Sequence, residues 1–446
     1  GGGGEEEEEE NESQMQRHVD KAHKTWKKNA AILYDFAMIQ SLECPSLTVQ
    51  WMPDRTYPDA DWCQHRLLIG TYSSSVAEEN KKRKDFLMLA AVSLPREMAN
   101  FEEGEEDDED DAPLDSCAAA QATIEIERKI PHAGEVNRAR YMPQNPDIIA
   151  TKSGSGGGEV YLFRLSKHVN FPKDDGKGCH DLLLKGHKDE GYGLAWSERQ
   201  AGFLVSGSYD HRVCVWDTNA TPSENRAGQV YLDPLITFVG HADAVGDVAW
   251  HPSQANIVGS VGDDGMLMTY DLRAGKSPAN QHRVSNLATN SLAFNLVNPH
   301  VLATASGDSG GGVVCVWDNR HLAAPVHRLQ HHSDVVDVVA WSPHSEHVLA
   351  SGSQDRMIHI LDLSNPVGHD PSDPRQVMFV HAGHTSKVSD VAFNAHDPWL
   401  LASVSDVEPT VQVWQMHRSI WGDPGGDADS VASSYDSEEL DEMAQK

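Results

Sequence analysis

Histidine, serine and aspartate recur together along this sequence, and the same three residue types form the catalytic triad of many hydrolases. In each copy a histidine precedes a stretch of small residues that contains serine and ends in aspartate. A hydrolase needs one triad, because one nucleophile requires one base, whereas here the set returns several times. We therefore interpret it as a repeating hydrogen-bond network, and a hydrolase is the least favoured function. The clearest copies pair His187 with Ser206–Asp210, His241 with Ser260–Asp264 and His332 with Ser351–Asp355.

Glycine-rich strings and cysteines indicate no further chemistry. The strings Ser153–Val160 and Ser306–Val314 look like phosphate-binding loops, but neither carries a GK[ST] ending or precedes a predicted helix. We interpret both as turns. The 6 cysteines include no CxxC pair, which is typical of a reducing compartment, and the 24 histidines show no paired helical spacing. We therefore expect no metal, no cofactor and no enzymatic activity.

A second recurrent pattern, a short apolar strand that usually ends in an aromatic residue, predicts the fold. Successive copies are 53, 54, 47, 44 and 53 residues apart, slightly more than the roughly 40–45 residues of a bare WD repeat. Together with the recurrent His, Ser, Asp and Trp, this spacing resembles the WD-repeat signature. The six copies are Val160–Arg164, Val213–Asp217, Leu267–Asp271, Val314–Asp318, Ile358–Asp362 and Val411–Gln415.

The expected fold is all-β, a seven-bladed WD-repeat β-propeller with an N-terminal α-helix packed on its side. The strand-like runs Ser46–Trp51, Leu67–Tyr72 and Phe86–Val92 would supply most of the seventh blade. We expect Val411–Gln415, or a neighbouring strand, to close the ring. The helix is predicted over residues 15–41 and the propeller over 42–421. Helical spacing carries the helix prediction through Val19, Ala22, Trp26, Leu33 and Phe36.

The charge of the chain favours a basic partner. Its 68 acidic and 36 basic residues give a net charge of −32, and 24 of the acids lie in three short runs. Such runs cannot bury surface, so we predict disorder over residues 1–14, 101–116 and 422–446. The acidic body argues against direct nucleic-acid binding, and the absence of a long apolar run argues against membrane insertion or secretion. The basic run Lys81–Lys84 is interpreted as a solvated loop, with a nuclear-import signal as the alternative.

Four stretches narrow the resemblance beyond a general WD repeat. They look like the retinoblastoma-associated histone-binding proteins, the small subunit of chromatin assembly factor, over about residues 17–421. The resemblance implies a histone-binding scaffold and chromatin regulator in the nucleus. It would act as a monomeric propeller in chromatin assembly (histone chaperone), histone acetyltransferase, deacetylase, remodelling and Polycomb complexes, with roles in transcription regulation and as a repressor. The stretches are Trp26–Trp51, Gly134–Lys152, Gly186–Trp196 and Phe379–Asn394.

An alternative function is that of a substrate receptor in a ubiquitin ligase, since WD-repeat propellers also do this work. The N-terminal helix and the GEVNRAR sequence at Gly134–Arg140 favour the histone-binding interpretation.

The resemblance implies a first histone site on the side of the propeller. In the family, a groove between the N-terminal helix and a loop near residue 370 takes the first helix of histone four. The family loop is longer and strongly acidic, whereas this one keeps only two acids, Asp370 and Asp373. We therefore expect apolar contacts to dominate. The remaining residues carried over are Ile32, Leu33, Phe36, Phe379 and Val380.

A second site, for the basic tail of histone three, is expected at the top entrance of the central channel. Residues three and five positions after each repeat histidine point the same way along a strand. They include two acids, an amide and an aromatic residue, which suit lysine or arginine. Counting in this way gives Glu135, Asn137, Glu190, Tyr192 and Asp337. The resemblance adds Glu43, Tyr72, Arg138 and Asn290.

Three departures predict weaker tail binding than in the family. Gly246, Tyr72 and Cys44 stand where the family has glutamate, histidine and tryptophan. Asp337, where the family has phenylalanine, restores one negative charge.

Overall fold

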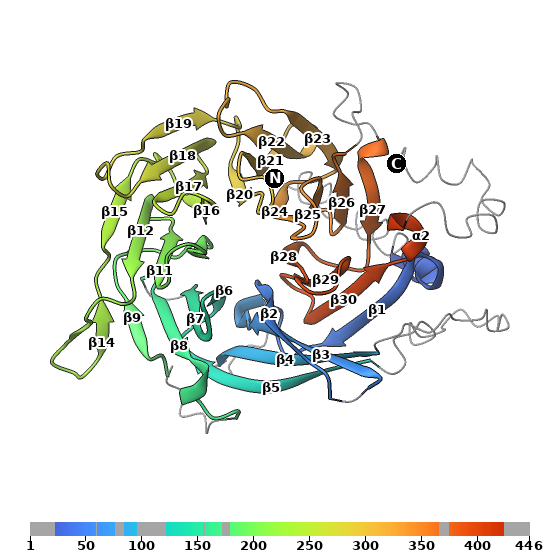
Figure 1. The fold of residues 1–446 in the computed structure, drawn as a ribbon, viewed down its shortest axis with the longest axis horizontal. Helices are drawn as coiled ribbons and strands as arrows, with labels where there is room; N and C mark the ends of the chain where they lie inside the picture. Colours follow the sequence, from blue (N-terminus) through green and yellow to red (C-terminus); the bar gives the residue numbers. More distant parts are fainter. Residues whose placement is uncertain are drawn as a thin grey trace, which may run out of the picture.

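The protein is a ring of seven antiparallel sheets, so the predicted seven-bladed β-propeller is confirmed (Figure 1). The computed structural model describes residues 23–58, 60–75, 84–95, 122–154, 157–171, 179–364 and 374–422. The predicted disordered segments 1–14 and 101–116, the tail beyond 422 and residues 81–83 of the basic run lie outside the described residues. The middle strands of the blades are the most deeply buried, as in β25 (Val348–Ser353) and β29 (Leu400–Ser405). Blades on either side cover both faces of each sheet, so small and apolar residues fill these strands.

The first four blades follow the chain from the centre of the ring outward. Blade one contains β2 (Val49–Thr56), β3 (Trp62–Gly70), β4 (Asp85–Pro95) and β5 (Thr123–His132). Blade two contains β6 (Val136–Met142), β7 (Asn145–Ser153), β8 (Val160–Arg164) and β9 (Leu182–Leu184). Blade three contains β10 (Leu194–Trp196), β11 (Phe203–Gly207), β12 (Arg212–Asp217) and β15 (Ile236–Val239). Blade four contains β16 (Val245–Trp250), β17 (Ile257–Gly262), β18 (Met266–Asp271) and β19 (Asn280–Arg283).

The remaining blades repeat this plan until the ring closes. Blade five contains β20 (Thr289–Phe294), β21 (Val301–Asp308), β22 (Gly311–Asp318) and β23 (His327–His332). Blade six contains β24 (Val336–Trp341), β25, β26 (Ile358–Asp362) and β27 (Val377–His381). Blade seven contains β28 (Val388–Phe393), β29, β30 (Thr410–Met416) and, at its outer edge, β1 (Tyr34–Ser41). The hairpin β13 (Ser223–Glu224) and β14 (Val230–Leu232) extends blade two. The short helices are η1 (Ser73–Ser75), η4 (Leu165–Lys167), η5 (Pro374–Gln376) and α2 (Arg418–Trp421).

The N-terminal segment corrects two expectations. The helix predicted over 15–41 is described over 23–33 only, and residues 34–41 form strand β1. β1 pairs antiparallel with β30, from Tyr34 opposite Met416 to Ser41 opposite Thr410. Without β1, β30 would be an unpaired edge, so pairing outweighs the helical spacing of the sequence. The strands before residue 130 make blade one with β5, and β1 rather than Val411–Gln415 closes the ring.

The repeated histidine, serine and aspartate form the predicted hydrogen-bond network within the blades. In blade four, His241 Nε2 lies 2.7 Å from Ser260 Oγ and its Nδ1 lies 3.0 Å from Asp264 Oδ1. In blade six, His332 is 2.9 Å from both Ser351 Oγ and Asp355 Oδ2. Each histidine thereby ties the loop before an inner strand to the turn after the second strand. The network is a structural device of each blade.

A buried carboxylate, Asp390 on β28, joins the three blades at the point of closure. Asp390 is 1% exposed at its side chain, and its Oδ2 accepts a hydrogen bond of 2.9 Å from the backbone N–H of Val49 on β2. The same carboxylate lies 3.1 Å from the guanidinium groups of both Arg138 and Arg140 on β6. Innermost strands of blades seven, one and two are thus held by one side chain.

We predict that Asp390→Ala strongly destabilises the propeller. The substitution leaves two buried guanidinium groups without their shared carboxylate, which costs about 3–5 kcal/mol for a broken buried ion pair. Unfolding in denaturant measures the loss. Asp271→Ala, which removes the partner of the exposed Arg273, is the control and should change the unfolding free energy little. Equal effects of the two substitutions would contradict this role of Asp390.

Acidification should destabilise the protein through its buried histidines. Burial lowers the pKa of His132 to about 4, and burial with the nearby Lys152 lowers the pKa of His187 to about 4. The unfolded chain takes up these protons near pH 6.5, well before the folded protein does. Stability should therefore be complete above about pH 6.5 and decline steadily toward pH 4.

Thermal unfolding at a series of pH values measures this decline. His132→Asn should flatten the profile between about pH 6.5 and 4, because one of the two shifted groups is gone. The exposed His321 provides the matched control, since His321→Asn should leave the shape of the profile unchanged. A profile that keeps its slope in His132→Asn would show that other groups control acid unfolding.

Candidate functional site

One end of the ring is built from the loops before the inner strands and the turns after the second strands. A backbone hydrogen bond joins the two at equivalent positions in five blades, with the turn N–H donating to the loop carbonyl. The pairs are Gly154 to Glu135 (3.0 Å), Tyr209 to Glu190 (2.8 Å), Asp263 to Ala244 (2.9 Å), Gln354 to Val335 (2.9 Å) and Asp406 to Lys387 (3.1 Å). Each loop residue lies three positions after its repeat histidine. The repeat therefore places these side chains at equivalent positions around one opening.

The structure brings together four of the residues predicted for the tail site, and we call Tyr72, Glu135, Glu190 and Tyr192 the channel mouth. Burial raises the pKa of Tyr72, and the charges of Glu135 and Glu190 raise it further. Burial and the same two carboxylates raise the pKa of Tyr192 to about 12. Both acids thus act on both phenols, although they come from neighbouring blades. The phenols stay protonated at neutral pH beside two carboxylates.

Polar contacts hold the two acids in place. Glu135 Oε1 accepts a 2.6 Å hydrogen bond from the backbone N–H of Ser74 and another from its hydroxyl. Glu190 Oε2 accepts a hydrogen bond of 3.3 Å from Asn137 Nδ2, which is also 3.3 Å from the carbonyl of Gly191. Asn137 is buried. Its place is therefore beneath the mouth as a support for Glu190.

Other residues predicted for this site lie elsewhere. Arg138 is 9% exposed and pairs with Asp390, while its Nε donates to the Tyr192 carbonyl at 3.2 Å. Its guanidinium is neutralised inside the ring, so Arg138 supports Tyr192 rather than facing the opening. Glu43 forms an ion pair with Lys129 on the outermost strand of blade one. That pairing separates it from the two acids of the mouth.

Asn290 and Asp337 form a second polar pair further around the ring. Asn290 Nδ2 lies 2.9 Å from Asp337 Oδ1, which also accepts a hydrogen bond of 3.1 Å from Gln354. Burial raises the pKa of Asp337. Gly246 lies nearby, and a Cβ atom there would be 2.7 Å from the carbonyl oxygen of Thr289. The backbones of blades four and five therefore meet too closely for a side chain without a shift.

Sequence reasoning missed Tyr209, whose ring centroid lies 6.0 Å from that of Tyr192 at an interplanar angle of 55°. It also missed Asp406, whose charge raises the pKa of Tyr72. Both occupy the same place in the repeat, three positions after the blade serine. Counting from the serine as well as from the histidine would have identified them.

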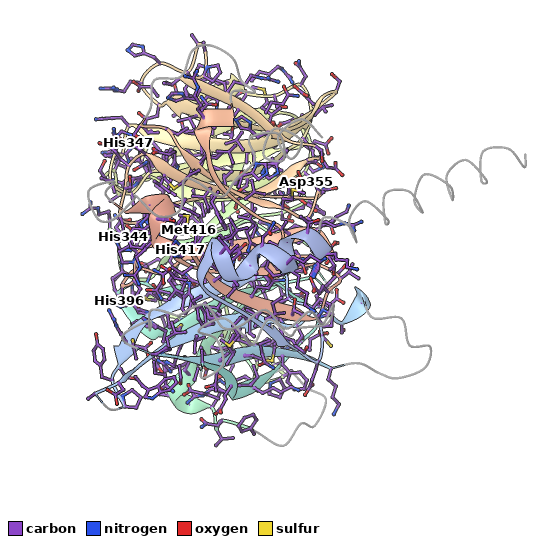
Figure 2. All side chains as sticks on the ribbon, turned by 90° about the vertical axis from the view of Figure 1, so that its right-hand side faces the viewer. His344, His347, Asp355, His396, Met416 and His417 are labelled. Carbon is purple, nitrogen blue, oxygen red and sulfur yellow. The ribbon has the colours of Figure 1, made fainter. Side chains whose placement is uncertain are left out.

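The side of the propeller carries the second predicted site. Trp26 of the N-terminal helix donates a 2.7 Å hydrogen bond to the hydroxyl of Tyr34, which lies 2.8 Å from His381 Nδ1 on β27. The helix ends where the Leu33 carbonyl accepts a hydrogen bond of 2.8 Å from the N–H of His417. Figure 2 shows Met416 and His417 beside this helix. Helix and β27 are thus fixed against each other through aromatic side chains.

Only part of the predicted helix-binding set is exposed. Ile32 is 54% exposed, Val380 on β27 is 37% exposed and Leu33 is half-buried against the core. Phe36 is fully buried on β1 and Phe379 is buried against Tyr34, so neither is available to a partner, contrary to expectation. Asp370 and Asp373 lie outside the described residues. We call the exposed rim of Ile32, Leu33 and Val380 the helix groove.

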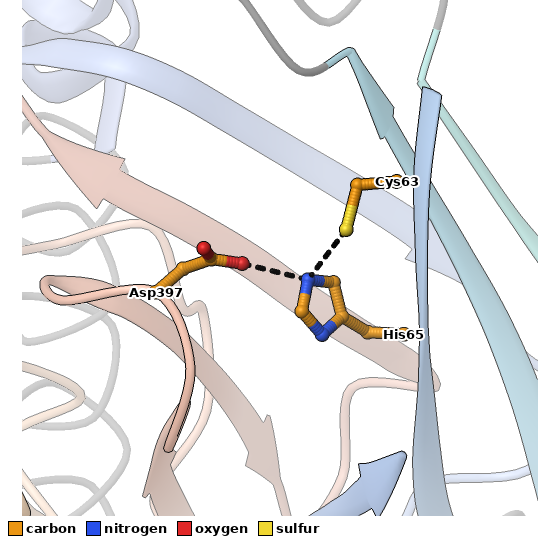
Figure 3. Close-up of side chains that lie close together, drawn as sticks. All are labelled: Cys63, His65 and Asp397. Carbon is orange, nitrogen blue, oxygen red and sulfur yellow. Dashed lines mark hydrogen bonds and ion pairs between the residues drawn. The ribbon is translucent and has the colours of Figure 1, made fainter. Parts of the chain in front are cut away.

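One cluster offers the donor types of a metal site. Cys63 and His65 lie two residues apart on β3, and Asp397 faces them from blade seven (Figure 3). His65 Nε2 is 2.7 Å from Asp397 Oδ2 and 3.2 Å from Cys63 Sγ. Arg55 supplies a positive charge, with its Nε 3.1 Å from the sulfur and Nη1 3.0 Å from Asp397 Oδ1.

The hydrogen bonds around His65 identify this cluster as a polar link between blades. Asn394 Oδ1 accepts from the N–H groups of His396 and Asp397, so its Nδ2 is the group that faces His65 Nδ1 at 3.3 Å. Nδ1 then accepts, and Nε2 carries the proton that it donates to Asp397. A metal ligand would need the opposite tautomer. We therefore assign no metal to these residues, which join blades one and seven.

Comparison with protein families gives two matches. Residues 21–96 match the family model described as the histone-binding protein RBBP4, or the C-type subunit of the CAF1 complex. Residues 180–217, 232–271, 323–362 and 375–415 match the WD domain, G-beta repeat. The first match covers the N-terminal helix, β1 and most of blade one, and the others cover blades of the ring. Among the described helices, none has the length and apolar character needed to cross a membrane.

The burial of the groove residues predicts contrasting effects of two substitutions on stability. Phe36→Ala should lower the free energy of unfolding by about 3–5 kcal/mol, because it opens a cavity in the core between blades. Ile32→Asp should change it by less than about 0.5 kcal/mol, since Ile32 is largely exposed. Denaturant unfolding measures both. A large loss in Ile32→Asp would mean that the exposed rim is part of the core.

Proposed function

We propose that this chain, which belongs to the WD-repeat histone-binding family of the RBBP4 and CAF1 type, is a non-catalytic scaffold with two histone sites. Histone binding is the function of the family, and the N-terminal model it matches is a histone-four-binding region. We further propose that the helix groove takes the first helix of histone four and the channel mouth takes the basic tail of histone three. A nuclear location and membership of chromatin assembly, acetyltransferase, deacetylase, remodelling or Polycomb complexes are parts of the same proposal.

The observation that carries the tail site is the convergence of Glu135 and Glu190 on the same two phenols. A lysine or arginine placed between the carboxylates can form charge-assisted hydrogen bonds, each contributing roughly 1.5–3 kcal/mol. The face of Tyr192 adds roughly 0.5–2 kcal/mol for a cation. Gly246 offers no acid on the far side, so binding through Glu135 and Glu190 must dominate. The site thus suits a tail with a basic residue at one fixed position.

The helix groove rests on an apolar argument. Ile32 and Val380 are exposed on two elements that Trp26, Tyr34 and His381 hold together. Burying a side chain of this size contributes roughly 1.5–3 kcal/mol, whereas an exposed ion pair contributes roughly 0–1 kcal/mol. An amphipathic helix that covers both side chains would therefore bind chiefly through its apolar face. Loss of loop acids such as Asp373 should matter less.

The acidic runs outside the described residues have a proposed role in steering. Exposed charges accelerate encounters with basic partners through long-range attraction, which salt screens. The runs would raise the rate at which histones reach the two sites without forming a site themselves.

Two variants and two peptides test the assignment of partners to sites. Titration of labelled peptides measures the affinity of a histone-four first-helix peptide and of a histone-three tail peptide. Ile32→Asp should weaken the helix peptide by about tenfold or more and leave the tail peptide unchanged, because it places a charge in an apolar contact. Glu190→Gln should weaken only the tail peptide, by about tenfold, because one charge-assisted contact is lost.

The matched control for Glu190→Gln is Glu198→Gln, an exposed acid in the loop after β10. It should leave both affinities unchanged. If both test variants weaken both peptides equally, the two sites are not separate. If Glu190→Gln binds the tail as tightly as the native protein, the channel mouth is not the tail site.

A further inference from the structure

We infer that the channel mouth and Tyr209 together form an aromatic cage that accepts a methylated lysine, an inference that rests on the proposed tail site. Two tyrosine rings form adjacent walls, since the centroids of Tyr192 and Tyr209 are 6.0 Å apart at 55°. Two aromatic faces at such an angle form a corner in which an ammonium group can contact both π-systems. Tyr209 is 36% exposed, so its ring can be reached from outside the ring of blades.

Tyr72 supplies a third aromatic group, and the two acids supply the charge. The pKa of Tyr192 is raised by Tyr72 as well as by Glu190 and Glu135, which places all four groups near one another. Burial and the neighbouring Tyr192 raise the pKa of Tyr209, whose environment also includes Glu190. Three neutral phenols therefore surround a point that two carboxylates make negative. A quaternary ammonium ion requires this combination of aromatic faces and negative potential.

The backbone holds the aromatic walls in place before any ligand arrives. The N–H of Tyr209 donates to the Glu190 carbonyl at 2.8 Å, and Ser208 Oγ donates to the Asp189 carbonyl at 2.7 Å. Gly191 lies so close to the turn that a Cβ atom there would be 2.7 Å from the Gly207 carbonyl oxygen. The loop with Tyr192 and the turn with Tyr209 are therefore in direct backbone contact. A cage formed in advance loses little entropy on binding.

The hydrogen bonds of the acids favour a methylated over an unmodified lysine. An unmodified ammonium group donates three hydrogen bonds and needs acceptors to replace water. Here Ser74 already engages Glu135 Oε1, and Asn137 engages Glu190 Oε2. A trimethylammonium group needs no acceptor, and its methyl groups gain contact with the aromatic faces. The carboxylates still attract its charge through space.

A series of peptides tests the cage. In the histone-three tail peptide, one lysine at a time is left unmodified, trimethylated or replaced by its neutral tert-butyl isostere, and titration gives the affinity of each. At one position the trimethylated peptide should bind at least as tightly as the unmodified one. It should bind about three- to tenfold tighter than the neutral isostere, because only the cation gains the electrostatic contribution. A trimethylated peptide that binds tenfold more weakly than the unmodified one at every position would overturn the cage.

Substitutions of Tyr209 separate the cage from the tail site as a whole. Tyr209→Ala should lower the affinity for the trimethylated peptide about three- to tenfold and barely change the unmodified one, while Tyr209→Phe, which keeps the ring, should retain both. Equal losses for the two peptides in Tyr209→Ala would overturn the inference. If the native protein binds neither peptide, the proposed function itself fails. If it binds only the unmodified peptide, the tail site stands and the cage does not.

Discussion

The carboxylate of Asp390 is the interaction on which the rest of the structure depends, because it lies where the ring must close. Each blade of a propeller contacts only its neighbours, so an open ring would leave two sheets with one face uncovered. Asp390 binds the backbone of blade one and two arginines of blade two from its place in blade seven. The pairing of β1 with β30 and the link through His65 and Asp397 reinforce the same junction. Closure in turn fixes the channel mouth, since Arg138 also holds the carbonyl of Tyr192.

The site depends on the fold through equivalent positions rather than through dedicated elements. The same backbone hydrogen bond between loop and turn recurs in five blades, so each blade presents two side chains at the same end of the ring. The chain then differs from blade to blade in what it places there: Glu135, the pair Glu190 and Tyr209, or Lys387 and Asp406. Chemical variety therefore arises within a constant frame, as expected where function lies in sites carried by a fold.

Much of the fold could be predicted from the sequence, because the histidine, serine and aspartate pattern is itself the network that holds each blade. The three N-terminal strands of blade one were predicted for the same reason, as short apolar runs. Residues 34–41 were not, because their helical spacing is a local property and the open edge of β30 is a long-range one. The same error made Phe36 a candidate contact rather than a core residue. At the channel mouth, counting from the histidines found Glu135, Glu190 and Tyr192. Tyr209 was missed because its position is fixed relative to the blade serine, which that count does not use.

The close approach at Gly246 constrains how this surface can change over evolution. A side chain there would meet the Thr289 carbonyl at 2.7 Å, so the strands of blades four and five have settled around its absence. Restoring the glutamate that the resemblance places at this position would require the neighbouring backbone to move first. The substitution is therefore contingent on others and cannot be reversed in one step. A lineage with this glycine is left to diversify its recognition on the opposite side of the opening, where Tyr72 and Tyr209 lie.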